Sequence, residues 1–425
     1  MKYFPIMRGG CAVPIAVDIS RMMDRIETLS GFNSTPGKGI TRFSYSPEDR
    51  KAREYLGTIF SALGLNVTVD GAGNIRARLE GSDPNAPAVL SGSHIDTVLH
   101  GGKYDGVVGT LGAVEAVQSI LESGLPRRCP LEVTVFAEEE GSNFGSTLSG
   151  SKALVGKYTL ADMEKLRTPE GKSMAGLLRE GGYAPETMAD NLLRPEKIRA
   201  MVELHIEQSV VLESRGVPVG IVEAVAGIRV LEIRIKGVPN HAGATPMTLR
   251  QDPLAAAARL MGTIEDLAKG SETGSTVGTV GKISCRPNVS NIIPGEVTFT
   301  VDIRDVQEAG IEFVAAGIKK EAAALAVSRD VSIDVVHISE SAPVRLDGHI
   351  AGVTEKCAGR RNFSSMRMNS GAVHDACMFA PLVPTGMIFI PSKGGRSHVP
   401  EEFTDPGDIE KGVSLLADVL YELSK

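Results

Sequence analysis

Blocks of helical and strand periodicity alternate along the chain. Apolar side chains recur at helical spacing over residues 47–63, for example at Leu56, Ile59, Phe60 and Leu63. Further along lie β-rich runs at 65–70, 74–79 and 87–91, a helical pattern at 106–123, and continuous apolar runs at 131–137, 200–204 and 386–390. Apolar runs of this kind are typical of strands buried on both faces. The alternation predicts an α/β domain with helices on both faces of a mostly parallel sheet.

The pattern changes between residues 226 and 339. Leu231, Ile233 and Ile235 alternate with charged residues, as expected for a half-exposed strand. A helix at 252–268, strands at 276–283 and 296–304, a helix at 308–327 and a strand at 331–338 follow. The order βαββαβ is that of α+β ferredoxin-like domains. We therefore expect 226–339 to form a domain inserted into an α/β domain made of 1–225 and 340–425.

Composition excludes several classes of protein. The 425 residues are enough for more than one core, and a net charge of −7, 4% aromatic residues and no Trp argue against a nucleic-acid partner. No run of about 20 apolar residues predicts a membrane span, and the apolar run Cys11–Val17 is too short and too Pro-interrupted for the hydrophobic region of a signal peptide. Five scattered cysteines, an odd number, favour a reduced, cytoplasmic protein.

Histidines and acidic residues follow several of the predicted strands. His94 follows the strand at 87–91, three glutamates follow 131–137, and His205 follows 200–204. Asp105 comes after the glycine pair at 101–102, and His398 lies eight residues beyond 386–390. Because ligands of open α/β sheets gather at the carboxyl ends of the strands, these side chains are expected to share one cleft.

The residue types in this cluster indicate metal-assisted hydrolysis. Imidazole and carboxylate together suit zinc, manganese or similar divalent ions. Three histidines and two carboxylates exceed the needs of one ion but suit two ions that share a carboxylate. A further carboxylate is then needed as the general base, and local spacing does not choose among Glu138, Glu139 and Glu140. Three further histidines, His100, His337 and His349, are expected to be structural or exposed.

Motifs spread over most of the chain carry a family resemblance. They are Gly92-Ser-His-Ile-Asp-Thr97, Gly101-Gly-Lys-Tyr-Asp-Gly106, Ala137-Glu-Glu-Glu-Gly-Ser142, Glu203-Leu-His-Ile-Glu-Gln208, Asn240-His-Ala-Gly-Ala-Thr-Pro-Met247, Arg286-Pro-Asn-Val-Ser-Asn291, His374-Asp-Ala376 and Pro391-Ser-Lys-Gly-Gly-Arg-Ser-His398. In this order they resemble the amidase, hydantoinase and carbamoylase branch of the M20 metallopeptidase-like family. The resemblance implies a zinc-exopeptidase-like catalytic domain and an inserted domain that serves as lid and dimer contact.

The resemblance also implies roles for the clustered residues. His94, Asp105 and His205 would hold one ion, and Asp105, Glu140 and His398 the second, with Asp105 shared. Glu139 would be the general base, and Asp96 would hydrogen-bond His94 from behind and fix its tautomer. The expected cofactor is a pair of divalent ions, Zn²⁺ first, with Mn²⁺, Co²⁺ or Ni²⁺ as alternatives.

Substrate recognition is expected to involve both domains. Arg304 would grip a substrate carboxylate, Asn291 would donate to the same end, and His374 would contact the carbamoyl end. His241 would stabilise the oxyanion and, by resemblance, come from the neighbouring subunit of a homodimer. Gln208 is a weaker substrate-binding candidate, which the sequence places in a helix after His205.

Together these features predict an amidohydrolase that acts on a small ureido acid, first an N-carbamoyl-L-amino acid. The alternatives are an allantoate amidohydrolase, an aminoacylase or exopeptidase, and a non-catalytic metal-binding protein of the same fold. Three departures from the branch bear on the substrate: Asn143 replaces a common Arg, Val373 a common Gly, and Lys103 a frequent Arg or Asn.

Overall fold

The computed structural model describes residues 14–425, which divide into two compact units. The first unit contains residues 14–223, 346–368 and 374–425, and the second contains Ala224–Arg345 and Asn369–Val373. Each unit has a hydrophobic core of its own. Cys11 and most of the segment considered as a targeting signal lie outside the described residues.

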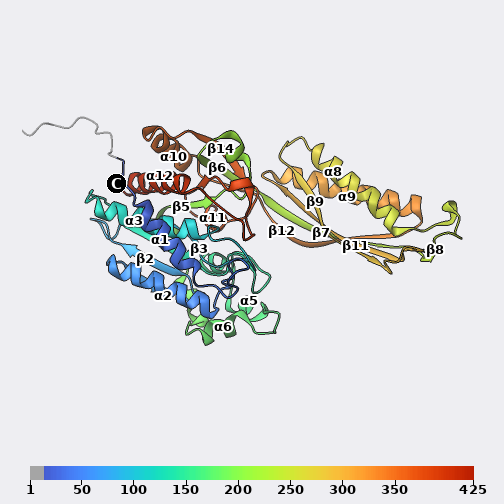
Figure 1. The fold of residues 1–425 in the computed structure, drawn as a ribbon, viewed down its shortest axis with the longest axis horizontal. Coiled ribbons are helices and arrows are strands. Elements are labelled where there is room, and N and C mark those ends of the chain that lie inside the picture. The colour runs from blue at the N-terminus through green and yellow to red at the C-terminus, as the bar shows by residue number, and fades with distance from the viewer. Residues whose placement is uncertain (1–13) are drawn as a thin grey trace, which may run out of the picture. The chain divides into compact units, whose positions relative to one another are not determined.

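The sheet of the first unit is parallel at its centre. Its strands are β1 (Asn66–Val69), β2 (Ile75–Leu79), β3 (Ala88–His94), β4 (Leu131–Phe136), β5 (Ile198–Ile206), β6 (Val219–Val225), β13 (Val344–Arg345), β14 (Ser365–Ser370) and β15 (Thr385–Ile390). Strands β4, β3, β5 and β15 are neighbours in that order and run parallel, whereas β2 and β6 flank them in antiparallel pairings. The mainly parallel centre confirms the predicted α/β class (Figure 1).

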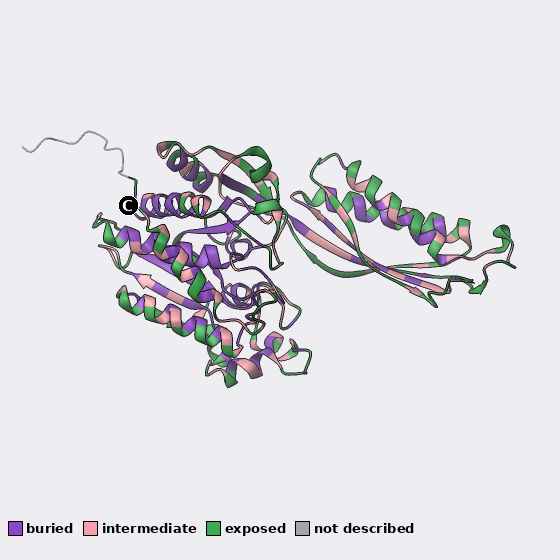
Figure 2. Ribbon diagram, in the orientation of Figure 1, coloured by how far each residue is buried: buried purple, intermediate pink, exposed green. Residues whose placement is uncertain are grey.

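Helices of the first unit cover this sheet. They are α1 (Ile19–Ser30), α2 (Pro47–Ala62), α3 (Val107–Glu122), α4 (Ser149–Leu154), α5 (Leu160–Lys165), α6 (Met174–Glu180), α7 (Val211–Arg215), α10 (Gly348–Arg360), α11 (Ala376–Phe379) and α12 (Pro406–Ser424), with 3₁₀ turns at Pro185–Asn191, Pro195–Lys197 and Lys393–Gly395. Helix α3 is apolar on nearly every face and packs against α12 and the central strands. Most of the helix is buried, as expected for a helix that is hydrophobic all round (Figure 2).

Successive residues of β5 point to different helices because side chains alternate across a strand. Leu204 lies against Gly112 of α3, where an added Cβ would come within 2.9 Å of its side chain. The ring of His205, the next residue, contacts that of His374 just before α11, with the centroids 4.6 Å apart. Helices therefore lie on both faces of the sheet, as predicted.

The second unit contains a four-stranded antiparallel sheet. Its elements are β7 (Gly227–Lys236), β8 (Asn240–His241), a 3₁₀ turn at Met247–Leu249, α8 (Pro253–Lys269), β9 (Val277–Arg286), β10 (Ile292–Ile293), β11 (Glu296–Asp305), α9 (Glu308–Arg329), β12 (Ser332–Ser341) and β13 (Val344–Arg345). The long strands follow the order β12-β7-β11-β9. Leu231, Ile233 and Ile235 of β7 join the core formed with α8 and α9, and the residues between them are less buried. Short strands β8 and β10 pair separately.

Two further observations bear on the expectations from sequence. None of the helices described in residues 14–425 is long and apolar enough to cross a membrane. Strand β3 continues through the polar residues Ser91–Ser93 to His94, which pairs in register with Phe136 of β4. His94 is therefore the last residue of the strand and does not lie in a loop after it.

Candidate metal centre

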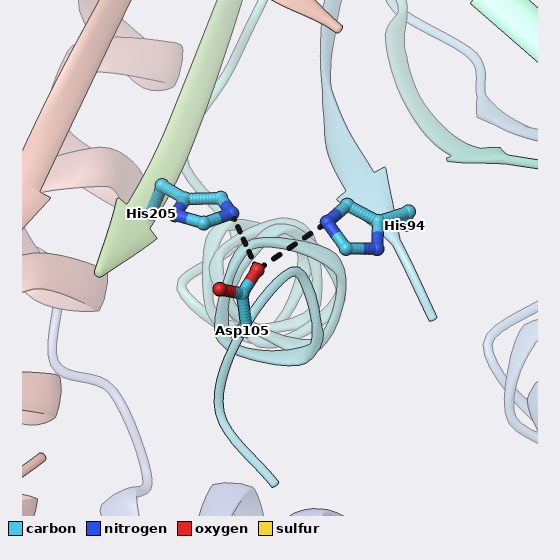
Figure 3. Close-up of side chains that lie close together, drawn as sticks. All are labelled: His94, Asp105 and His205. Atoms are coloured by element: carbon cyan, nitrogen blue, oxygen red, sulfur yellow. Dashed lines mark ion pairs between the residues drawn. The ribbon is translucent and has the colours of Figure 1, made fainter. Parts of the chain in front are cut away.

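Two parallel strands bring His94 and His205 to the same edge of the sheet. His94 ends β3, His205 is the penultimate residue of the adjacent β5, and their ring centroids are 6.0 Å apart. Asp105, in the turn before α3, lies between the two rings (Figure 3). The following residue, Gly106, has φ +65°, and an added Cβ there would come within 2.4 Å of the His94 ring. A glycine is therefore required where the chain passes this imidazole.

The two carboxylate oxygens of Asp105 face different groups of side chains. Its Oδ1 lies 3.3 Å from Nε2 of His205 and 3.6 Å from Nε2 of His94. Its Oδ2 lies 3.5 Å from Nε2 of His398, which is itself 3.4 Å from Oε2 of Glu140. Asp105 is thus placed to give one oxygen to each of two ligand groups.

The three consecutive glutamates point in three directions. Glu138, at φ +52°, accepts the Asn143 backbone N–H at 3.2 Å, away from the histidines. Glu139 Oε2 lies 3.7 Å from Nε2 of His94, and Glu140 faces His398. The choice among them that local spacing left open thus has a structural basis: only Glu139 and Glu140 approach the histidine cluster.

Among the described residues, four three-residue groups have ligand atoms within 4.8 Å of one another, close enough to hold an ion, and two of them match the predicted sets: His94, Asp105 and His205, and Asp105, Glu140 and His398. The other two are His94, Glu139 and Glu140, and Glu203, His205 and His374. Nδ1 of His94 contacts the Asp96 carbonyl at 3.0 Å, and Nδ1 of His205 contacts the Ile206 carbonyl at 2.9 Å. A carbonyl partner keeps the proton on Nδ1, so Nε2, on the side of Asp105, carries the free lone pair that an ion would need. The donor types and tautomers therefore fit a pair of divalent ions.

Electrostatics support the same interpretation. Burial raises the pKa of Asp105, but His205, His398 and His94 outweigh it and hold this pKa well below the usual range. Burial raises the pKa of Glu139 well above its usual value, and the nearby Glu140 and Asp375 add to the rise against the effect of His94. Burial, followed by the Asp105 charge, raises the pKa of Glu140 to about 7. So many buried carboxylates repel one another, and divalent cations would relieve that repulsion.

A family model described as peptidase family M20/M25/M40 matches residues 90–422. The chain belongs to this family. M20 enzymes are hydrolases that depend on two metal ions, and the paired ligand groups around Asp105 agree with that property.

Relatives across the whole chain carry three different substrate names. An N-carbamoyl-L-amino acid amidohydrolase of Geobacillus stearothermophilus is 38% identical over 405 residues, 95% of this chain and 98% of that protein. An allantoate amidohydrolase of Escherichia coli is 38% identical over 400 residues, covering 93% and 96%. A ureidoglycolate hydrolase of Arabidopsis thaliana is 36% identical over 419 residues, covering 97% and 88%. All three names describe hydrolases of non-peptide C–N bonds.

A solved structure gives the same family assignment. The amidase of the hydantoinase/carbamoylase family from Burkholderia multivorans superposes with a TM-score of 0.91 at 31% identity, covering 96% of this chain and 98% of that one. The resemblance inferred from the motifs is thereby confirmed.

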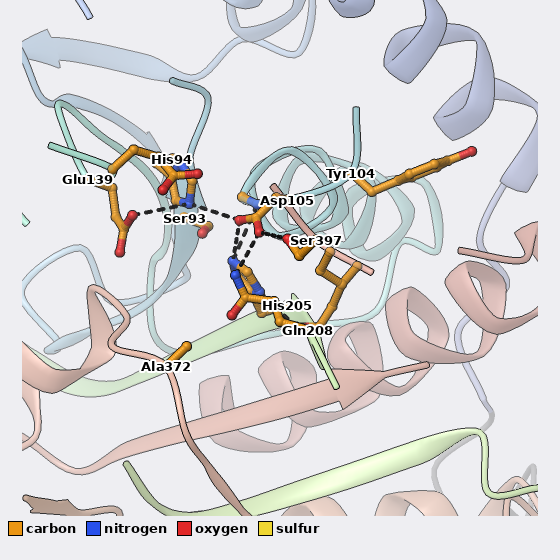
Figure 4. Close-up of polar contacts among 12 residues, drawn as sticks. Ser93, His94, Tyr104, Asp105, Glu139, His205, Gln208, Ala372 and Ser397 are labelled. Carbon is orange, nitrogen blue, oxygen red and sulfur yellow. Dashed lines mark hydrogen bonds and ion pairs between the residues drawn. The ribbon is translucent and has the colours of Figure 1, made fainter. Parts of the chain in front are cut away.

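Asp96 and Gln208 of this M20 chain both contact residues of the cluster. Nδ1 of His94 contacts the backbone carbonyl of Asp96 at 3.0 Å, and the Asp96 carboxylate, 3.7 Å from the same nitrogen, accepts the backbone N–H groups of Glu139, at 3.3 Å, and Glu140, at 3.1 Å. Gln208 is not helical, because its φ is +58° and the next helix begins at Val211. Its Nε2 donates to Asp105 Oδ2 at 2.6 Å, so it contacts the shared carboxylate (Figure 4).

The second unit contains the other expected substrate residues. His241 in β8 and Asn291, next to β10, lie in one two-stranded ribbon in which Ile292 pairs with His241. Arg304 is near the far end of β11, where it donates to Asp302 and to the Gly371 carbonyl. Eight strand residues separate Glu296, at the ribbon end of β11, from Arg304, a span of roughly 26 Å. Within one chain, the structure therefore does not bring Asn291 and Arg304 together.

Sequence reasoning did not identify Glu203, a buried acid beside the centre. Glu203 in β5 accepts the Ser93 hydroxyl at 2.8 Å and the Ala376 N–H at 2.9 Å, which links two strands to the segment after His374. With both oxygens engaged, we interpret Glu203 as a support for His205, two residues along the same strand face. The only sign of Glu203 in the sequence was one acidic residue inside an apolar strand run.

Burial and the neighbouring His205 hold the pKa of His374 well below its usual value, so this imidazole is neutral.

Proposed function

We propose that this M20 enzyme hydrolyses the C–N bond of a small ureido acid, an N-carbamoyl-L-amino acid in the first instance. The observation that carries the proposal is the split of the Asp105 oxygens between two ligand groups, with Glu139 beside one of them. In this proposal His94, Asp105 and His205 hold one ion, and Asp105, Glu140 and His398 hold the other. Zn²⁺ suits these donors, and Mn²⁺, Co²⁺ and Ni²⁺ are alternatives.

Glu139 acts as the general base and acid of the reaction. Two divalent ions bound by these residues would lower the pKa of a water molecule and polarise the ureido carbonyl. Glu139 takes the proton of this water as it attacks and then delivers the proton to the leaving nitrogen. Burial raises the pKa of Glu139, and this supports the first step, because a carboxylate of raised pKa is a stronger base. An N-carbamoyl amino acid plus one water would thus give the amino acid, CO₂ and ammonia.

His241 stabilises the oxyanion in this mechanism. Its Nδ1 accepts the backbone N–H groups of Gly243, at 3.0 Å, and Ala244, at 3.1 Å. In the neutral ring the proton must then be on Nε2, which makes that atom a hydrogen-bond donor. An N–H donor is what a developing negative oxygen requires. Two backbone donors on Nδ1 therefore support the role that the family resemblance implies.

A homodimer reconciles the positions of the recognition residues. Asn291 shares a ribbon with His241, while Arg304 lies roughly 26 Å along β11. If one subunit supplies Arg304 and its partner supplies the ribbon, the two can hold the same substrate. Strand β9 offers a contact, since it is an edge of its sheet and its residues are largely exposed. An exposed edge strand pairs readily with a second copy.

The substrate assignment is tested by comparing kcat/KM for the ureido acids named for the relatives, each assayed separately. Ammonia release is measured with N-carbamoyl-L-amino acids, allantoate and ureidoglycolate side by side, each also with the Glu139→Gln variant to remove non-enzymatic release. The highest kcat/KM is expected with an N-carbamoyl-L-amino acid, with His374 beside its carbamoyl end. A higher value with allantoate would transfer the proposal to that substrate. Release from none of them would refute the proposed class.

A cytoplasmic location completes the proposal. The four cysteines of residues 14–425 are all free thiols, and Cys129, Cys357 and Cys377 are buried. Free, buried thiols are usual where the surroundings are reducing.

A further inference from the structure

Glu402 places a buried carboxylate directly behind the shared aspartate. Its Oε1 accepts the backbone N–H of Tyr104 at 2.8 Å and that of Asp105 at 3.0 Å. Its Oε2 lies 2.9 Å from the Ser397 hydroxyl, and the residue is 4% exposed. Among the described residues, Glu402 is in none of the groups close enough to share an ion.

The same network reaches the Asp105 side chain. The Ser397 hydroxyl also contacts Asp105 Oδ2, the oxygen to which Gln208 donates (Figure 4). Glu402 therefore holds the backbone N–H of Asp105, and Ser397, which Glu402 also contacts, holds the Asp105 carboxylate. The plane of a carboxylate held at both places cannot rotate freely, which keeps Oδ1 toward His205 and Oδ2 toward His398.

A glycine makes this approach possible. A Cβ added at Gly102 would come within 2.2 Å of Glu402 Oε1 and 2.4 Å of its Cβ. Contacts this short do not occur between real atoms, so any larger residue at 102 would displace the Glu402 carboxylate. The Gly101-Gly102 turn thus leaves the space in which Glu402 lies beneath the Tyr104 and Asp105 peptides.

We propose that Glu402 is a positioning residue that orients Asp105 to bridge two ions. Loss of Glu402 should therefore weaken the binding of the ion held by Asp105, Glu140 and His398. The inference rests on the two-ion site of the proposed function. Groups behind metal ligands typically change metal affinity by about 10- to 100-fold when removed. Glu402 itself contributes no ligand, since both of its oxygens are engaged by the loop and by Ser397.

The hydrogen bonds that each substitution at residue 402 can make show whether the position requires a correctly placed side chain or a negative charge. The Ser397 hydroxyl has one hydrogen and can donate to only one of the two carboxylates that it contacts. A glutamine at 402 would accept both backbone N–H groups with its oxygen and donate its amide N–H to Ser397, leaving the hydroxyl hydrogen for Asp105. Glu402→Gln should therefore preserve the arrangement, and Glu402→Ala should destroy it.

The test measures metal binding by the full-length protein. Apoprotein is titrated with Zn²⁺ and with Mn²⁺ by calorimetry, and bound metal is counted by mass spectrometry after dialysis. Glu402→Ala is expected to retain one ion and bind the second about 10- to 100-fold more weakly. Glu402→Gln and Glu401→Ala, at the exposed neighbour, should bind two ions as the wild type does.

The outcomes separate this inference from the proposed function. Two ions bound by Glu402→Ala with wild-type affinity would overturn the positioning role, as would a Glu402→Gln variant as weak as Glu402→Ala. If Glu402→Ala does not fold, Ser397→Ala replaces it, and weaker second-ion binding is again expected, with wild-type binding overturning the role. Fewer than two ions in the wild type would instead refute the two-ion site itself.

Discussion

Nε2 of His398 lies 3.4 Å from Oε2 of Glu140, although the two residues differ in exposure: the His398 side chain is 47% exposed and that of Glu140 is 7% exposed. The histidine also has φ +60°, a left-handed backbone uncommon for residues other than glycine. Such strain is typical of functional sites, where surrounding contacts hold a side chain in place. His398 is therefore the exposed member of the pair, and the proposed second ion would enter and leave on its side.

Uptake of the second ion should depend on pH. The hydrogen bond to Asp105 raises the pKa of His398 to about 9, and burial raises that of Glu140 to about 7. Both groups must lose protons to become ligands, so protons compete with the ion. Affinity should rise about tenfold per pH unit near pH 8, where the ion displaces about one proton from His398, and less steeply toward pH 9. Calorimetry in buffers of different ionisation enthalpy counts these protons, and a pH-independent affinity would contradict the assignment.

Glu139→Gln and Glu138→Gln form a matched pair of variants. Glu139 lies beside His94, whereas Glu138 accepts the Asn143 N–H, which a glutamine oxygen can also do. Glu139→Gln should lower kcat by about 10²- to 10⁴-fold while leaving two ions bound. Glu138→Gln should stay within a few-fold of wild-type activity. Equal losses in both variants would show that the general base has been misassigned.

Removal of the Arg42 side chain should destabilise the first unit without touching a ligand. This arginine is 1% exposed and donates to the carbonyls of Ile95, at 2.7 Å, Leu29, at 2.8 Å, and Phe32, at 3.2 Å. Arg42→Met leaves these carbonyls without their donor, which should cost about 3 kcal/mol of unfolding free energy. Urea unfolding measures the loss, with Arg50→Met at an exposed site of α2 as control. Equal midpoints for the two variants would disprove the structural role.

Periodicity was enough to predict the centre of the fold. The apolar runs at 131–137, 200–204 and 386–390 correspond to β4, β5 and β15, because strands buried on both faces need apolar residues throughout. The end of β3 was missed because Ser91-Gly92-Ser93 looks like a loop in sequence. Gly92 is required inside the strand, since an added Cβ would come within 1.7 Å of the Thr134 carbonyl.

The support around the centre was not predictable from local sequence. Glu402 meets the Tyr104 backbone across 298 residues, and Glu203 meets Ala376 across 173. Local patterns carry no information about such pairings, which exist only once the sheet has formed. The left-handed backbone of Gln208 is similar: nothing in Glu207-Gln208-Ser209 distinguishes it from the start of a helix. Motif resemblance predicted which residues form the cluster, and the geometry added the contacts that surround them.

Hybrid dimers should test whether His241 serves the partner's site. His241→Ala and Glu139→Gln are each expected to be nearly inactive, the first through loss of an oxyanion donor worth about 10²- to 10³-fold in kcat. If the His241 of each subunit serves the site of its partner, then in a dimer of one variant with the other, one site carries both defects and the other carries neither. Unfolding the two variants together and refolding them at equal amounts should therefore restore about a quarter of wild-type activity. If His241 serves its own subunit, every site in the mixture retains one defect, and activity stays at the level of the separate variants.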